Sequence, residues 1–249
     1  MEGPLARLRL NRPEALNAAN WAWVNDLVTA TSALASSAEV RVVIVSGEGR
    51  AFCSGLDVKE LARGSLSTDW FAVWESGVTA LANLDAITIA AVHGYCLGGG
   101  LQVAIVCDLL LAADDAVFSI PAVREGLVAG LGPMRLARLI GVAPAKRLCL
   151  LGRPFSAAEA AVLGLVAEIV SPANQLERGT LVLAQELLEI PFTALRHTKR
   201  QIAHAFNSDS DDVFLQELVA AEDDCLRSPE HAAVMAAYRA AQSARAADA

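Results

Sequence analysis

The sequence predicts an α/β fold with parallel strand pairing. Three short apolar runs, typical of strands covered on both faces, lie at 40–45, 87–93 and 109–113. Segments with helical spacing of apolar residues lie between them, at 14–35 and 69–83. Strands that alternate with helices up to about residue 120 favour a parallel sheet flanked by helices.

Composition excludes several classes of protein. The 249 residues are 54% hydrophobic and 19% charged, which argues against a disordered chain and favours one large domain. Acidic residues outnumber basic residues 28 to 20, so we expect no nucleic-acid partner. The five cysteines form no CxxC pair and the four histidines are scattered, so no metal site is expected. Reduced thiols fit a cytoplasmic protein.

The N-terminal half predicts strands followed by turns. Leu8 and Leu10 alternate with arginines, which indicates a half-buried strand that ends at 11–13. The run at 40–45 is closed by the turn at 46–49. The most apolar stretch, 86–113, is interrupted by polar residues and four glycines. We therefore expect a buried strand–turn–helix–strand there, and no membrane span.

The C-terminal half predicts mainly helices. Ser156 and Glu159 fit a capping box, with Glu159 reaching back to the cap, and 165–170 predicts one more strand. The last helix has an alanine-rich face, which would pack either on another subunit or on its own domain. Helix starts are predicted at Gly132-Pro133, near Pro144, near Pro191 and after Ser228-Pro229.

Two segments carry glycines where a strand gives way to a turn. One is 51–59, AFCSGLDVK, and the other is 93–102, HGYCLGGGLQ. Glycines at such places let the backbone approach a ligand closely, and two N–H groups aimed at one point would hold a developing oxyanion. The spacing fits neither a dinucleotide fingerprint, a P-loop nor a nucleophile elbow. Tight packing of helix against strand is the alternative explanation.

The chain resembles the enoyl-CoA hydratase/isomerase (crotonase) family. The matches keep the family order over nearly the whole chain: NRPEALNA at 11–18, AFCSGLD at 51–57, GYCLGGG at 94–100, CD at 107–108, and 158–170 with GLV at 164–166. The resemblance implies an α/β spiral of ββα turns with a C-terminal helical oligomerisation region. It places an acyl-CoA-binding core at 1–190 and a helical trimerisation region at 191–249. It also implies a homotrimer or hexamer.

The resemblance further implies acyl-CoA thioesters as ligands, with coenzyme A as part of the substrate and no separate cofactor. Its shared mechanism is a thioester enolate held by two backbone N–H groups, which by motif position belong to Leu56 and Gly99. Lys59 would pair with a CoA phosphate or be an ordinary solvated lysine. The binding residues implied are Ser54, Gly55, Leu56, Asp57, Val58, Lys59, Gly98 and Gly99.

The sequence departs from the family at two catalytic positions. Hydratases of the family use two glutamates, and these positions hold Gln102 and Ala122 here. An amide positions a water but cannot take its proton, and alanine does neither. Glu125 is the best candidate for a replacement carboxylate, because residues 122 and 125 share a helix face; a surface glutamate is the alternative.

Other residues near these motifs have two interpretations each. Trp70, Phe71 and Trp74 either line an acyl pocket or pack in the core. His93 and Asp108 are expected to be structural, and covalent catalysis at Cys53 or Ser54 lacks an identifiable base. The chain is thus interpreted as an acyl-CoA-binding lyase or isomerase of fatty acid metabolism that is weak as a hydratase. The alternatives are a catalytically silent acyl-CoA-binding or regulatory protein and a thioester hydrolase.

Overall fold

The computed structural model describes residues 3–190, 192–204, 223, 226–227 and 229–247. Its main sheet has five strands in the order β1-β2-β4-β6-β9, and every pair is parallel, as predicted. These strands are β1 (Leu5–Leu10), β2 (Val42–Gly47), β4 (Ile87–Val92), β6 (Leu109–Ala113) and β9 (Glu168–Val170). The predicted runs at 87–93 and 109–113 are both strands of this sheet.

In a second, smaller sheet, three of the four strands each follow a strand of the main sheet. Its order is β3-β5-β7-β8, with β8 antiparallel to its neighbour. The chain passes from β2 to β3, from β4 to β5 and from β6 to β7, and each pair is followed by a helix. This repetition is the predicted spiral of ββα turns. The strands are β3 (Ala51–Cys53), β5 (Tyr95–Leu97), β7 (Val117–Ser119) and β8 (Phe155–Ser156).

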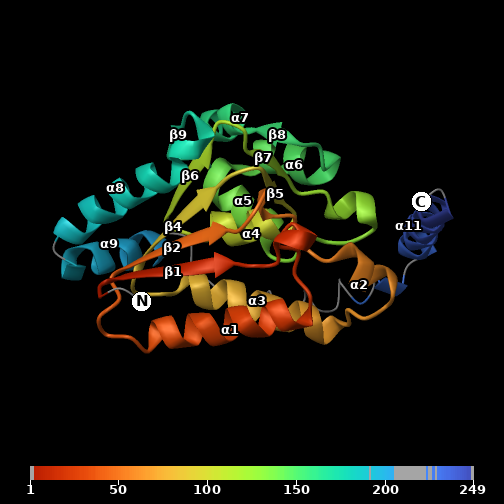
Figure 1. Ribbon diagram of the computed structural model, residues 1–249, viewed down its shortest axis with the longest axis horizontal. Coiled ribbons are helices and arrows are strands. Elements are labelled where there is room, and N and C mark those ends of the chain that lie inside the picture. The colour runs from red at the N-terminus through yellow and green to blue at the C-terminus, as the bar shows by residue number, and fades with distance from the viewer. Residues whose placement is uncertain (1–2, 191, 205–222, 224–225, 228, 248–249) are drawn as a thin grey trace.

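Helices cover both faces of the main sheet (Figure 1). The strand β4 is buried along its whole length, and its side chains alternate between two hydrophobic clusters. Ala90 and Val92 face the cluster that includes α1 (Trp21–Ala35) and α3 (Thr68–Ala82). Ile89 and Ala91 face the cluster that includes α8 (Leu176–Glu189). Burial on both faces explains why this strand is a continuous apolar run.

The helices described are α1 (Trp21–Ala35), α2 (Val58–Ala62), α3 (Thr68–Ala82), α4 (Gly99–Ile105), α5 (Gly132–Ile140), α6 (Val142–Leu151), α7 (Ala157–Val162), α8 (Leu176–Glu189), α9 (Phe192–His204) and α11 (Pro229–Ala247). Three 3₁₀ turns are η1 (Pro13–Ala15), η2 (Ala122–Glu125) and η3 (Ala173–Gln175). Within the described residues, no helix is long and apolar enough to cross a membrane.

The predicted helix at 14–35 is wrong in its first third. After η1 the chain turns through Leu16 and Asn17, which have positive φ angles of 51° and 58°, and α1 begins only at Trp21. The Asn17 amide is buried and donates to the carbonyl oxygens of Glu48, Ala51 and Phe52. These tertiary hydrogen bonds hold the segment out of the helix, a competition typical of asparagine.

Two further predictions need correction. The predicted strand at 165–170 is reduced to the last three residues, Glu168–Val170. Ser156 caps α7 by accepting from the Glu159 N–H at 3.2 Å, as predicted. The Glu159 carboxylate does not complete the box, because it accepts from Arg147 at 2.6 Å instead.

The C-terminal helix α11 lies beside α2 (Figure 1). Its Met235 is buried, and its Arg239 donates to the Ala62 carbonyl oxygen at 2.6 Å. This contact with the chain's own core agrees with one of the two interpretations of that helix. The trimerisation region at 191–249 stays a prediction, and much of it, including Pro191 and the start at Ser228, lies outside the described residues.

Candidate active site

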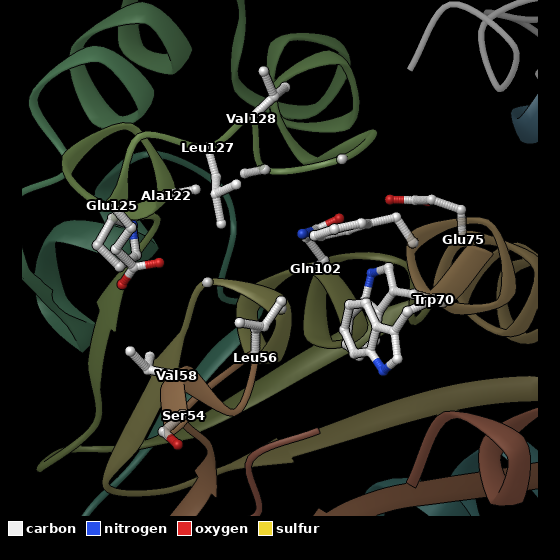
Figure 2. Close-up of a pocket in the computed structure, with 17 residues that line it drawn as sticks. Ser54, Leu56, Val58, Trp70, Glu75, Gln102, Ala122, Glu125, Leu127 and Val128 are labelled. Carbon is white, nitrogen blue, oxygen red and sulfur yellow. The ribbon is translucent and has the colours of Figure 1, made fainter. Parts of the chain in front are cut away.

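A cavity lies where both glycine-bearing turns meet α3 and the segment from η2 to Gly130 (Figure 2). Its volume, counted as the space that the centre of a water molecule can occupy, is about 70 Å³. Its lining is mostly apolar and brings together most of the predicted site residues. The lining residues are Ser54, Leu56, Val58, Trp70, Phe71, Trp74, Glu75, Gly98, Gly99, Gln102, Pro121, Ala122, Glu125, Leu127, Val128, Ala129 and Gly130.

The two predicted oxyanion donors line this cavity from adjacent loops. Leu56 follows β3, and Gly99 is the first residue of α4. Their N–H groups donate to no acceptor within the described part of the chain, whereas the neighbouring Gly98 and Asp57 amides are bonded to Ser119 and Ala19. Gly99 also stands at a helix N-terminus, where the dipole favours negative charge. Both amides are therefore available to an oxygen in the cavity.

The glycines keep the two loops in close contact. A Cβ on Gly55, where φ is +94°, would lie 2.7 Å from the Leu97 carbonyl oxygen and 3.0 Å from the Gly99 nitrogen. A Cβ on Gly100 would lie 2.1 Å from the Cys53 carbonyl oxygen. Tight packing therefore accounts for Gly100, and it also sets the positions of the Leu56 and Gly99 amides.

The remaining loop residues do not line the cavity. The Asp57 carboxylate caps α2 by accepting from the Lys59 and Glu60 N–H groups, and Arg12 lies 3.2 Å away. The Asp57 side chain therefore holds the loop in place. Lys59 is exposed on α2, outside the cavity wall.

The two departures from the family pattern face the same cavity. Gln102 lies on α4, one turn after Gly99, and Ala122 begins η2. Glu125 ends η2, and because 3₁₀ residues three apart share a face, it lines the cavity with Ala122. Burial raises the pKa of the Glu125 carboxyl above its usual range. Such a shift is typical of carboxyls that transfer protons.

A buried carboxylate that the sequence analysis missed also lines the cavity. Glu75 on α3 is 1% exposed, and its carboxylate lies 3.0 Å from the Arg135 guanidinium and accepts from the Leu131 N–H at 2.9 Å. The signal was present, because Glu75 shares the apolar helix face of Phe71 and Val78. A charge on such a face needs a buried partner.

Similarity to known proteins agrees with this geometry. The enoyl-CoA hydratase/isomerase family profile matches residues 1–238. The chain belongs to this family. A probable enoyl-CoA hydratase of Mycobacterium bovis is 38% identical over 215 residues, covering 84% of this chain and 82% of the relative. A peroxisomal Delta(3,5)-Delta(2,4)-dienoyl-CoA isomerase of Arabidopsis thaliana is 35% identical, covering 72% and 69%.

Solved structures show the same crotonase fold. An enoyl-CoA hydratase from Mycobacterium avium subsp. paratuberculosis has a TM-score of 0.85 at 27% identity, with 95% of each chain covered. A carnitinyl-CoA dehydratase from Mycobacterium avium has a TM-score of 0.82 at 32% identity, covering 93% of this chain and 92% of that one.

Two other polar residues that the sequence singled out, Asp108 and His93, bond to neighbouring segments of the chain. The Asp108 carboxylate accepts from the Thr88 N–H at 2.7 Å and from Lys199 at 2.7 Å, so it joins two strands to α9. His93 is partly exposed, and its Nε2 lies 2.9 Å from the Gly49 carbonyl oxygen. Both residues lie outside the cavity wall.

Nucleophilic catalysis by the loop residues has little support. Burial raises the pKa of Cys53 to about 12, and its sulfur contacts the Asn17 carbonyl oxygen at 3.2 Å. A thiol with that pKa is not a nucleophile at neutral pH. Ser54 lines the cavity, but its hydroxyl is directed at the Ala15 carbonyl oxygen at 3.5 Å.

Proposed function

We propose that this hydratase/isomerase-family protein binds acyl-CoA thioesters and stabilises the thioester enolate with the Leu56 and Gly99 N–H groups. The observation that carries the proposal is that both amides line one cavity and have no acceptor within the described residues. Each such donor contributes typically about 3–4 kcal/mol of transition-state stabilisation. The names of the relatives, which include hydratases, a dehydratase and a dienoyl-CoA isomerase, support acyl-CoA as the ligand.

The side chains of the cavity favour a double-bond shift over hydration. Removal of a proton from the acyl chain leaves an enolate, whose negative oxygen the two amides hold. The Glu125 carboxylate takes that proton and, as the neutral acid, returns it to another carbon of the chain. Burial raises the pKa of the Glu125 carboxyl, which makes the carboxylate a stronger base for this step. Hydration would need a second titratable group for the water, and Gln102 and Ala122 provide none.

A panel of acyl-CoA substrates tests the proposal. Incubation with 3-enoyl-CoA should give the 2-enoyl isomer, detected by its absorbance and by an unchanged mass. Crotonyl-CoA should gain water very slowly, seen as an increase of one water mass. Fast hydration of crotonyl-CoA would contradict our interpretation of Gln102 and Ala122. Failure of every acyl-CoA to bind would contradict the function altogether.

A catalytically silent acyl-CoA-binding protein is the second candidate. The replacement of both glutamates by Gln102 and Ala122 favours it. Binding uses the same two amides, so the cavity does not distinguish the two functions. Binding by calorimetry without any product in the mass spectrum would favour this second candidate.

A further inference from the structure

The cavity that holds the two free amides has a small volume. The space open to the centre of a water molecule is about 70 Å³, which corresponds to roughly five waters. A methylene group takes up about as much room as a water molecule, so roughly five chain carbons fill the cavity. The CoA moiety is far larger and has to lie outside it. The length of acyl chain that fits therefore depends on how firmly the walls are held.

One wall consists of aromatic side chains on α3 that are stacked against α1. The Trp70 and Trp74 ring centroids lie 5.6 Å apart with 15° between the planes, and those of Trp74 and Trp23 lie 5.5 Å apart with 21° between them. The Phe71 ring stands at 85° to that of Trp70, with 5.2 Å between centroids. All four side chains are more than nine-tenths buried. A longer acyl chain would have to displace these packed rings.

Two further contacts hold α3 in place. Gly77 lies against α1, where a Cβ would be 3.2 Å from side-chain atoms of both Leu27 and Val28. The Glu75 carboxylate accepts from Arg135 of α5 at 3.0 Å. The helix that carries the aromatic wall is thus held by two neighbouring helices, which opposes any lengthening of the cavity in this direction.

Backbone closes the cavity on the side where Figure 2 shows Leu127. The Leu127 N–H donates to the Ala122 carbonyl oxygen at 2.9 Å, and the Leu131 N–H donates to the Glu75 carboxylate at 2.9 Å. A Cβ on Gly130 would overlap the same carboxylate, so this segment and α3 touch without a gap. The cavity therefore has no room to extend between them.

Trp70 is the aromatic residue whose replacement would enlarge the cavity with the least damage. It lies at the end of the indole stack, and its N–H has no acceptor within the described part of the chain, so replacing it breaks no hydrogen bond. Trp74 is packed between two other indoles, and a Cβ on Gly99 would lie 2.9 Å from its ring. Replacing Trp74 would therefore also disturb the proposed oxyanion donor at Gly99.

The fixed indole of Trp70 marks a limit on the space for the acyl chain. We propose that Trp70 restricts the site to short acyl-CoA thioesters, with acyl groups of up to about five carbons, and excludes longer chains. This inference rests on the proposed function, in which the thioester carbonyl lies at the Leu56 and Gly99 amides of the same cavity.

A series of saturated acyl-CoA thioesters tests the limit on the wild-type protein. Butyryl-, hexanoyl- and octanoyl-CoA differ only in chain length, and calorimetry measures the affinity of each. A methylene that enters an apolar site raises affinity by about fourfold, whereas one forced into a filled site lowers it. We expect octanoyl-CoA to bind about tenfold more weakly than butyryl-CoA. Affinity that is equal for all three, or that rises through octanoyl-CoA, would overturn the inference and leave the proposed function standing. No binding of any thioester would overturn both.

The variant Trp70→Leu tests the role of the indole. It removes the ring system and keeps an apolar side chain, so the affinity of octanoyl-CoA relative to butyryl-CoA should rise about tenfold. Trp21→Leu is the matched control, because Trp21 is partly buried outside the cavity wall and its loss should leave this ratio unchanged. An unchanged ratio in Trp70→Leu, or an equal rise in the control, would overturn the inference.

A milder variant guards against loss of the fold. Circular dichroism checks that Trp70→Leu folds. Trp70→Phe keeps one aromatic ring and should change the ratio in the same direction by a smaller factor, so it decides the question where the leucine variant does not fold. A ratio in folded Trp70→Phe that equals the wild-type ratio would then overturn the role of Trp70.

Discussion

The Arg135 guanidinium lies 3.0 Å from the carboxylate of Glu75, which lines the cavity, and both side chains are at least nine-tenths buried. Arg135 also donates to the Thr79 hydroxyl at 2.9 Å, which ties α5 to α3. Because Glu75 lines the cavity, the pair links the stability of the fold to the shape of the site.

Breaking this pair should destabilise the protein strongly. Arg135→Met leaves the buried Glu75 carboxylate without its guanidinium, so we expect the free energy of unfolding to fall by about 3–5 kcal/mol. Urea unfolding followed by circular dichroism measures the change. Exposed Arg153 provides the control, since Arg153→Met should change stability by less than about 0.5 kcal/mol. Similar losses in both variants would contradict a special role for the buried pair.

Deleting the Gly99 N–H should remove enolate stabilisation. Gly99→Pro takes away the hydrogen, and we expect turnover of 3-enoyl-CoA to fall by about 10²–10³-fold. Gly99→Ala is the matched control: it keeps the N–H, but its Cβ would lie 2.9 Å from the Trp74 ring. Circular dichroism checks that both variants fold. Full turnover by the proline variant would place the oxyanion site elsewhere.

The sequence predicted the main sheet and the two glycine-bearing loops because their signals are local. Apolar runs mark strands buried on both faces, and glycines mark loops that touch. Asn17 and Glu75 depend instead on distant partners. Asn17 bonds carbonyl groups more than 30 residues away, and Glu75 pairs with Arg135, 60 residues along the chain. Such pairings depend on the folded topology, so spacing alone does not reveal them.

Glu125 should control the rate and its pH dependence. Glu125→Gln removes the only carboxyl proposed to move a proton, and we expect turnover to fall by about 10²–10⁴-fold. The active form is the carboxylate, so wild-type activity should be lost as the pH falls through the Glu125 pKa. Because burial raises that pKa, the loss should occur at a higher pH than for an ordinary glutamate.

The exposed Glu189 serves as a control for this experiment, because Glu189→Gln should change neither the rate nor the pH profile. The profile of kcat/KM is the decisive measurement, since it reports groups of the free enzyme. An acid limb that persists unchanged in Glu125→Gln would assign the titration to another group.

Restoring both carboxylates should convert the site toward hydration. Gln102→Glu combined with Ala122→Glu supplies the two groups of the family pattern, and we expect crotonyl-CoA hydration to rise by about 10²–10⁴-fold. Neither single variant should give the full gain, because activation of water and protonation of carbon need separate groups. The carboxyl introduced at position 102 would lie near Glu75, whose negative charge should raise the pKa of the introduced group and shift the optimum to higher pH. A double variant that folds, binds crotonyl-CoA and gains no hydration would show that the missing carboxylates are not what limits this chain.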